Sequence, residues 1–344
     1  MLMKTKIINE NNKNVVEEAV KFITQNELVA IPTETVYGLG GNGLSDEACK
    51  KIFEAKNRPS DNPLILHISE ILELDRLVEE VPAKVKKALE YYWPGPLTII
   101  LKKSDIIPHT VTCGGDTVAI RMPNKEITRN IIRKAGVPIA APSANLSGRP
   151  SPTTALDVYE DMKEKIPLII DGGACNVGIE STVLDCTCEP NLILRPGFYS
   201  KEDLEIHFGS VEYDKSILKD GEIPKSPGQK YKHYAPSGSM EVILGNRYKV
   251  RDFFNQRATE LKGKKTALIT FEDNNDLASS FYKFYSLGSR DNLLEMASLI
   301  FRILRQCDDD GIENILCEGV EEKNLGIGIM NRLKKSCAGN VKII

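Results

Sequence analysis

Two short segments carry the side chains best suited to chemistry. Lys56-Asn57-Arg58-Pro59 supplies two permanent cations, and Ser143-Ala144-Asn145 supplies a hydroxyl and a carboxamide. Arginine offers planar, paired donors to phosphate oxygens, and lysine offers a compact positive charge. Neither segment holds an acid or a thiol that could act as a nucleophile. These residue types favour binding and polarising a polyphosphate over hydrolysis.

The sequence lacks the motifs of several common enzyme classes. It has no Walker G-x-x-x-x-G-K-[ST] run, no G-x-S-x-G elbow and no H-E-x-x-H pair. An S-x-x-K pattern fails at Ser143 because Leu146 takes the fourth place. P-loop kinases, serine hydrolases and zinc proteases are therefore excluded.

A glycine-rich run imitates a dinucleotide-binding fingerprint. Residues 38–43 (GLGGNG) match G-x-G-x-x-G, but residues 32–37 separate them from the preceding apolar strand, whereas the fingerprint needs its glycines directly after it. No acid follows about 20 residues later at the end of a second strand. A dehydrogenase is disfavoured, and the glycines indicate a loop with positive φ or a close backbone approach.

Several polar residues next to apolar runs have two open interpretations. His67 fits a hydrogen-bonded core histidine or a ligand contact, and the threonines of Thr33-Glu34-Thr35 fit a turn or a site. Lys56 and Arg58 also fit a solvated helix end. Arg121 ends an apolar run, and burying it would require an anionic partner.

The apolar patterns predict the elements that position these residues. Helical spacing begins at Val15, and Ser45 followed by two acids predicts an N-capped helix over 46–56 that ends at Lys56. Further helices are predicted at 83–92, 125–134 and 154–162, and strands at 28–31, 63–68, 97–101, 117–121, 137–141, 168–171, 181–185 and 192–195. The polar motifs fall at strand ends, as ligand sites in open α/β sheets usually do.

Length and composition predict two domains. A chain of 344 residues is longer than a typical single domain, and its 41% of hydrophobic residues are enough to form two hydrophobic cores. We expect an α/β domain over residues 1–208, a linker over 209–237 and a smaller α/β domain over 238–344. The linker is broken by glycines and prolines, but its aromatic and basic residues at 226–236 also make it a candidate active-site lid.

The net charge and the cysteine pattern exclude further classes of protein. A formal net charge of −3 argues against a globally basic nucleic-acid-binding protein and leaves local basic patches open. The eight cysteines form no C-x-x-C pair and no histidine stands at zinc-ligand spacing, so no protein-ligated metal is predicted. No apolar run approaches the ~20 residues of a membrane span. We expect a reduced, cytoplasmic protein.

Ordered motifs occur along essentially the whole chain. They are 32–39 (PTETVYGL), 56–59 (KNRP), 62–64 (NPL), 119–123 (AIRMP), 141–148 (APSANLSG), 180–183 (ESTV), 194–197 (LRPG), 226–236 and 328–333. Together they resemble the threonylcarbamoyl-AMP synthase family, and the last two match its long two-domain form. The resemblance implies a YrdC-type twisted mixed sheet with flanking helices, a linker and a smaller Rossmann-like α/β domain.

The resemblance implies an enzyme, a nucleotidyltransferase that condenses L-threonine, bicarbonate and ATP into threonylcarbamoyl-adenylate and releases pyrophosphate. The product would pass to a tRNA threonylcarbamoyl transferase for threonylcarbamoyladenosine modification of tRNA. ATP would be a substrate accompanied by Mg²⁺. Direct contact with tRNA is not required, and no membrane is expected.

The resemblance also assigns roles by position. The catalytic set is Lys56, Arg58, Ser143 and Asn145. The L-threonine contacts are Thr35, His67, Arg121, Ala141 and Ser181. The ATP contacts are Arg58, Asn62, Thr117, Ser143, Ser151, Arg195 and Tyr231. The absence of a nucleophile agrees with this chemistry, which asks the protein to align two anions and to stabilise charge on a phosphoryl group.

Two other functions stay open from the residues alone. A non-catalytic module could bind tRNA or double-stranded RNA in a basic cleft, and its affinity would then depend steeply on salt concentration. Arg121, Ser143 and Ser181 at strand ends suit a small carboxylate ligand better. The second domain could also serve as a nucleotide-dependent regulator.

Overall fold

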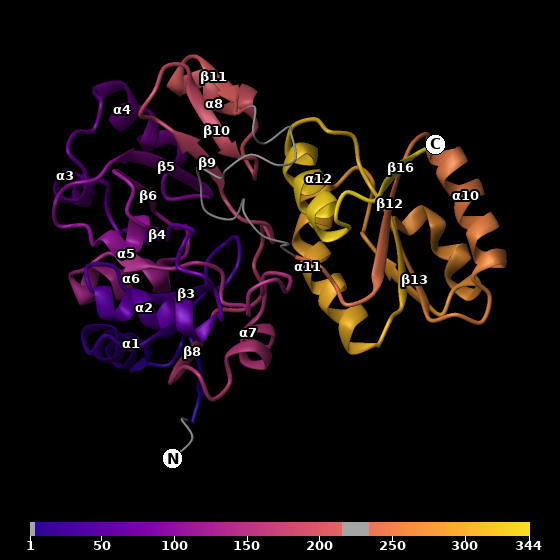
Figure 1. The fold of residues 1–344 in the computed structure, drawn as a ribbon, viewed down its shortest axis with the longest axis horizontal. Coiled ribbons are helices and arrows are strands. Elements are labelled where there is room, and N and C mark those ends of the chain that lie inside the picture. The colour runs from indigo at the N-terminus through magenta and orange to yellow at the C-terminus, as the bar shows by residue number, and fades with distance from the viewer. Residues whose placement is uncertain (1–3, 215–233) are drawn as a thin grey trace. The chain divides into compact units, whose positions relative to one another are not determined.

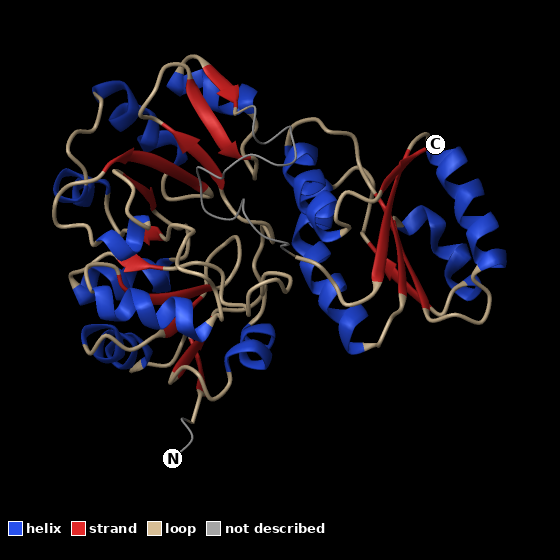
Figure 2. Cartoon of the chain, viewed as in Figure 1, coloured by secondary structure: helices blue, strands red, loops and turns tan. Residues whose placement is uncertain are grey.

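The chain forms two compact units in a computed structural model that describes residues 4–214 and 234–344 (Figure 1). Described residues up to 214 build the first unit, apart from Gly148–Pro150 and Val177–Ile179. These two short segments belong with residues 234–344 to the second unit. Both units mix helices with strands (Figure 2).

An 11-stranded mixed sheet is the framework of the described part of the first unit. Parallel and antiparallel neighbours both occur, since β4 runs parallel to β6 and β5 runs antiparallel to it. The order across the sheet is β1 (Lys6–Asn9), β8 (Leu168–Asp171), β2 (Val29–Ile31), β3 (Gly38–Asn42), β7 (Ile139–Ala140), β4 (Ile65–His67), β6 (Thr117–Arg121), β5 (Leu97–Lys102), β9 (Thr182–Asp185), β10 (Asn191–Arg195) and β11 (Val211–Tyr213).

Local signals in the sequence explain where the helices of this unit begin. At α2 the Ser45 hydroxyl accepts a hydrogen bond from the Ala48 amide, and at α7 Thr154 and Asp157 form a capping box. The helices are α1 (Val15–Thr24), α2 (Asp46–Ala55), α3 (Leu74–Leu77), α4 (Ala83–Tyr92), α5 (His109–Thr112), α6 (Glu126–Ala135), α7 (Ala155–Met162) and α8 (Lys201–Phe208), with a 3-10 turn η1 at Ile71–Glu73.

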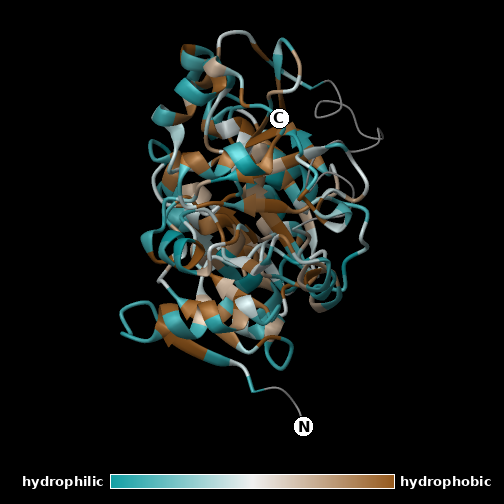
Figure 3. Cartoon of the chain, turned by 90° about the vertical axis from the view of Figure 1, so that its left-hand side faces the viewer, coloured by the Kyte–Doolittle hydropathy of each residue, from teal (hydrophilic) through white to brown (hydrophobic). Residues whose placement is uncertain are grey.

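The two faces of this sheet bury different apolar clusters. Alternate side chains of the central strands, such as Leu66, Ile120 and Ile99, enter the main core. On the other face, Ile31 and Ile139 lie in a second cluster to which α1 and α6 contribute. In Figure 3 many of the strands in the middle of the molecule are brown, the colour of hydrophobic residues. The part of that second face over β4, β6, β5, β9 and β10 carries polar groups, described below.

The glycine-rich run forms strand β3 instead of the predicted loop. Its backbone φ angles are not in the left-handed region, so positive φ is not the reason for the glycines. A Cβ at Gly40 would lie 2.9 Å from Ile139, and one at Gly43 would lie 2.6 Å from Leu66. Close approach of neighbouring strands therefore accounts for the glycines, and the dinucleotide interpretation fails.

The second unit contains a five-stranded sheet in which every described pair is parallel. The strand order is β14 (Lys283–Ser286), β13 (Thr266–Thr270), β15 (Asn314–Glu318), β12 (Ser239–Leu244) and β16 (Val341–Ile343). Helices α11 (Leu293–Asp309) and α12 (Leu325–Ser336) lie on one face, and α10 (Arg247–Glu260) with η2 (Glu272–Ser280) lies on the other (Figure 1). The predicted fold class, a large mixed sheet and a smaller Rossmann-like unit, is confirmed.

Candidate functional site

Polar side chains from four neighbouring strands share one face of the first sheet. On β6 the alternate positions Thr117, Ala119 and Arg121 point to the same face, and on β4 His67 stands level with Arg121. Between these polar groups lies a small apolar cluster that includes Ile65 and Ala119. This face therefore combines an apolar floor with a few placed polar groups, the usual composition of a small-molecule site.

Arg121 is the charged centre of this face. Its side chain is 5% exposed, and Nη1 donates to the Thr35 hydroxyl at 2.8 Å while Nε donates to the Gly95 carbonyl at 3.2 Å. Nη2 lies 2.7 Å from the Glu34 carboxylate, whose side chain is 10% exposed. The expected anionic partner of a buried arginine is therefore Glu34, which our residue-by-residue predictions did not include.

His67 is a buried, uncharged neighbour of Arg121. Burial first, and the Arg121 cation second, lower the pKa of His67 from 6.5 to about 3. The carbonyls of Ile65 and Ile139 oppose this shift, and Nδ1 lies 3.3 Å from the Ile65 carbonyl oxygen. A neutral imidazole can hydrogen-bond to a ligand without adding charge beside Arg121.

Ser181 and Arg195 extend the polar face across β9 and β10. The Ser181 hydroxyl lies 2.7 Å from the Thr98 hydroxyl, and Thr98 is paired in register with Arg121. Arg195 donates from Nε to the Ser181 carbonyl and from Nη2 to the Ser181 hydroxyl, both at 3.1 Å. Thr98 links these groups, and no sequence signal distinguished it from an ordinary strand threonine.

Lys56 joins the two segments that the sequence singled out. Its side chain, 3% exposed, donates to the carbonyl oxygens of Ser143 and Asn145, the latter at 2.6 Å, and lies 3.4 Å from the Asn145 side-chain oxygen. Three of the four predicted catalytic residues are thus brought together. Lys56 is the C-cap of α2, so the end of this helix places the Lys56 ammonium group next to the loop.

Backbone hydrogen bonds hold the 142–147 loop in place. The Leu39 amide donates to the Pro142 carbonyl at 2.7 Å, and the Ala144 amide donates to the Tyr37 carbonyl at 2.8 Å. The Ser147 amide donates to the Lys56 carbonyl at 2.9 Å. Backbone hydrogen bonds to Leu39, to Tyr37 and to the end of α2 therefore hold the loop together with the Lys56 side chain.

The described contacts of Arg58 lie in its own loop and at the end of α2. Nη2 donates to the Asn62 carbonyl at 2.7 Å, and the guanidinium carbon stands 5.6 Å from the centre of the Phe53 ring. The Asn62 side chain is buried. The hydrogen bond to the Asn62 carbonyl places two predicted nucleotide contacts, Arg58 and Asn62, next to each other.

The remaining predicted contacts are distributed as follows. Ser151 is buried and donates to the Glu180 carboxylate at 2.5 Å, which makes Glu180 a second buried acid that the predictions did not include. Ala141 follows β7 and donates from its amide to the Ile65 carbonyl at 3.0 Å. Tyr231 lies outside the described residues.

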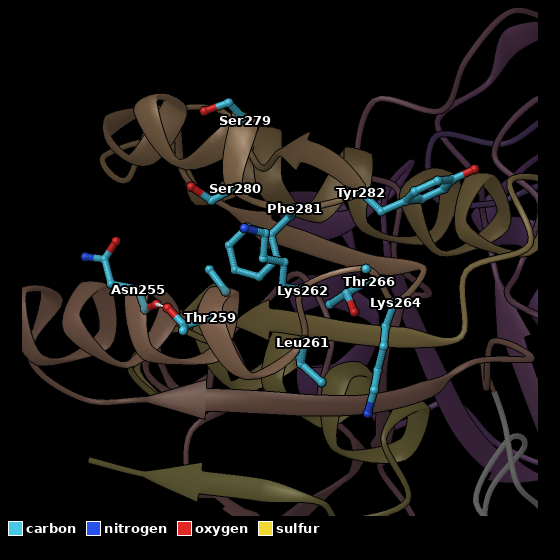
Figure 4. Close-up of a pocket in the computed structure, with 12 residues that line it drawn as sticks. Asn255, Thr259, Leu261, Lys262, Lys264, Thr266, Ser279, Ser280, Phe281 and Tyr282 are labelled. Atoms are coloured by element: carbon cyan, nitrogen blue, oxygen red, sulfur yellow. Dashed lines mark hydrogen bonds between the residues drawn. The ribbon is translucent and has the colours of Figure 1, made fainter.

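The second unit has an open groove of about 790 Å³ between the end of α10 and the start of β14. Figure 4 shows Asn255 and Thr259 on one side and Phe281 and Tyr282 on the other. The groove lies at the amino end of β13, where Thr266 stands, whereas ligands of open parallel sheets bind at the carboxyl ends. Its lining contains none of the predicted site residues.

Comparison with known proteins assigns the chain to a family. A model of the Sua5, YciO and YrdC proteins, described as "Telomere recombination", matches residues 21–197, and a model described as "Threonylcarbamoyl-AMP synthase, C-terminal domain" matches residues 199–338. The threonylcarbamoyl-AMP synthase of Pyrococcus abyssi is 46% identical over 321 residues, which cover 92% of each chain. This chain belongs to the threonylcarbamoyl-AMP synthase family.

Two further relatives span nearly the full chain. The threonylcarbamoyl-AMP synthase of Bacillus subtilis is 41% identical over 96% of this chain and 95% of its own. The crystal structure of P. abyssi Sua5 complexed with L-threonine superposes with a TM-score of 0.93 at 43% identity, covering 99% of this chain and 100% of that one. The resemblance drawn from the motifs is confirmed, including the long two-domain form.

No helix in the described ranges 4–214 and 234–344 is long and apolar enough to cross a membrane. The same ranges contain no group of three or more histidine, cysteine, aspartate or glutamate side chains arranged to hold a metal ion.

Proposed function

We propose that this chain condenses L-threonine, bicarbonate and ATP into threonylcarbamoyl-adenylate and pyrophosphate, the activity for which its full-length relatives are named. The observation that carries the proposal is the contact of the buried Lys56 ammonium group with the carbonyl oxygens of both Ser143 and Asn145. It joins two segments, distant in sequence, whose residue types suit phosphoryl chemistry.

The polar sheet face is our candidate for the threonine site. Arg121 supplies a buried cation for the carboxylate, and Thr35, His67 and Ser181 supply groups that can hydrogen-bond to the hydroxyl and amino groups. Ala141 completes the set as a small residue beside Ile65. The L-threonine bound to P. abyssi Sua5, a relative with the same fold over the whole chain, supports this assignment.

The cationic residues around the 143–145 segment are our candidate for the nucleotide site. Lys56, Arg58, Ser143 and Asn145 form the proposed catalytic set. Asn62, Thr117, Ser151, Arg195 and Tyr231 are the further ATP contacts that we assign. Several separate strands and loops supply these residues, so the site depends on the fold of the whole first unit.

The reaction can be written with every bond accounted for. The threonine ammonium group first loses a proton to solvent; its nitrogen then attacks the carbon of bicarbonate, water leaves, and a carbamate forms. A carbamate oxygen then attacks the α-phosphorus of ATP, the bond from that phosphorus to the bridging oxygen breaks, and pyrophosphate leaves with the electron pair. The protein aligns two anions and offsets their repulsion with Lys56, Arg58 and Arg195.

We propose that Mg²⁺ enters with the triphosphate. The side chains assigned to the nucleotide are mostly cations, hydroxyls and carboxamides, whereas Mg²⁺ prefers carboxylate, phosphate and water oxygens. The residues present therefore fit a metal that is held mainly by the substrate. When bound, Mg²⁺ would neutralise part of the phosphate charge.

Three further assignments follow as proposals. The catalytic domain spans residues 1–208, the linker 209–237 and the second domain 238–344, although β11, which pairs with β10, extends the first sheet past residue 208. The adenylate would pass to a tRNA threonylcarbamoyl transferase. The reaction would take place in the cytoplasm, where the eight free cysteines would stay reduced.

The test is the release of pyrophosphate from ATP with each co-substrate omitted in turn. The proposed function predicts release only when threonine and bicarbonate are both present. Release that does not change when either is left out would refute it.

A further inference from the structure

Glu34 is a largely buried acid that lies directly beside the proposed substrate arginine. Oε1 lies 2.7 Å from Arg121 Nη2, and the two side chains are 10% and 5% exposed, respectively. The second oxygen accepts a hydrogen bond from the Asn124 amide at 3.1 Å. A carboxylate has about four acceptor positions, so these two described contacts leave acceptor capacity for a ligand.

Arg121 also keeps donor capacity. A guanidinium group carries five N–H donors, and the described contacts use one each toward Gly95, Thr35 and Glu34. The remaining donors can meet a carboxylate while the pair with Glu34 stays intact. A cation and an anion with unused hydrogen-bonding capacity therefore stand side by side in the site.

This pair matches the charges of a free amino acid. If Arg121 had to bind only a carboxylate, a neighbouring acid would weaken that binding by repulsion. A free α-amino acid carries its carboxylate and its ammonium group on the same carbon, so it brings one charge for each member of the pair. The competing explanation is that Glu34 only neutralises a buried arginine.

We propose that Glu34 determines substrate specificity by binding the ammonium group of the amino acid, so that the site recognises a zwitterion. The inference rests on the proposed function, because it takes L-threonine as the substrate. Glu34 and Arg121 then act as a matched pair: the arginine selects the carboxylate and the glutamate selects the amine.

Two ligands and one variant separate the two explanations. L-Threonine carries both charges, whereas (R)-3-hydroxybutanoate is the same molecule without the amino group. Calorimetric titration of the full-length protein should show that Glu34→Gln weakens threonine binding at least ~10-fold, about 1.4 kcal/mol. The same variant should change hydroxybutanoate binding less than about threefold, which would also show that it is folded with a working Arg121.

Control variants complete the experiment. Arg121→Lys should weaken both ligands, because both carry a carboxylate. Glu27→Gln, which alters an acid paired with Lys51 on the surface, should change neither. Glu34→Asp keeps the negative charge on a shorter side chain, so it should weaken threonine binding by an intermediate factor and leave hydroxybutanoate binding unchanged. This variant takes the place of Glu34→Gln if Glu34→Gln does not fold.

Two results would overturn the inference. Equal weakening of both ligands by the Glu34 variants would show that Glu34 only positions Arg121, and unchanged threonine binding would show that it has no role in recognition. If the wild-type protein binds threonine but fails the pyrophosphate test, the proposed function fails while the recognition of a zwitterion stands. If it does not bind threonine at all, both fail.

Discussion

Replacing Lys56 by methionine tests whether its ammonium group organises the catalytic loop. The side chain is 3% exposed and bonds the Asn145 carbonyl at 2.6 Å as well as the Ser143 carbonyl. Losing the partner of a buried carbonyl costs about 1–3 kcal/mol, and the partly buried Ser143 carbonyl should cost less because water can reach it. We therefore expect a loss of about 2–4 kcal/mol in the free energy of unfolding.

The same variant should lose catalysis. The missing charge should lower the rate of threonine-dependent pyrophosphate release at least ~100-fold, which corresponds to about 2.7 kcal/mol of transition-state stabilisation. Urea unfolding and the pyrophosphate assay would be run on one preparation, at a temperature where the variant is still folded. Both losses are expected together.

Lys51→Met is the matched control. Lys51 lies on the same helix, but it is 30% exposed and pairs with Glu27 and Glu47 at 2.8 and 3.0 Å. Exposed ion pairs contribute at most about 1 kcal/mol, and this lysine lies outside the proposed site, so the activity should not change. If Lys56→Met keeps wild-type stability and turnover, the reasoning about the loop is wrong.

Three more predictions concern other parts of the first unit. Arg58→Ala should lower turnover ~100-fold or more because it removes charge near the phosphates, with a small change in stability; wild-type turnover would contradict the assignment. The wild-type free energy of unfolding should fall as the pH drops from about 6.5 toward 3, by up to about 1.4 kcal/mol per pH unit from His67, because this histidine takes up a proton only after unfolding. His67→Gln should remove that part of the slope in urea titrations, and equal slopes would argue against a buried neutral imidazole. Gly43→Ala should cost about 1–3 kcal/mol because its Cβ would lie 2.8 Å from the backbone carbonyl oxygen of Pro138, which cannot easily move away. Gly115→Ala, where the nearest contact is 3.3 Å, should cost less than about 1 kcal/mol, and similar losses for both would refute the packing argument.

Regular alternation and clear caps made much of the fold predictable. The strand at 117–121 and the helix at 83–92 appear with the predicted limits as β6 and α4. Their signals are local, because an apolar run or a helical period can be read from neighbouring residues.

Elements with weak local signals were missed. β3 consists largely of glycines, and Gly40 fits closely against Ile139, a constraint that depends on a residue far away in sequence. The helix α10 has few apolar positions, and β11 lies inside the stretch predicted as a linker. In these places tertiary packing overrides local propensity.

The candidate site could also be predicted only in part from the sequence. Residue types alone indicated phosphate chemistry around Lys56 and Ser143, and the structure brings these two residues into contact. The roles of Glu34 and Thr98 depend on partners in other strands and could not be recognised from single positions. An acid flanked by two threonines, next to an apolar run, was the one available hint for Glu34.

The most direct measurement is mass spectrometry of the nucleotide product formed from ATP, L-threonine and ¹³C-bicarbonate. We predict one product that contains AMP, threonine and a single ¹³C atom. It should form with an equal amount of pyrophosphate and be strongly reduced in Lys56→Met. Conversion of ATP to ADP or to free AMP, with no nucleotide that carries both threonine and the labelled carbon at any time during the reaction, would contradict this prediction.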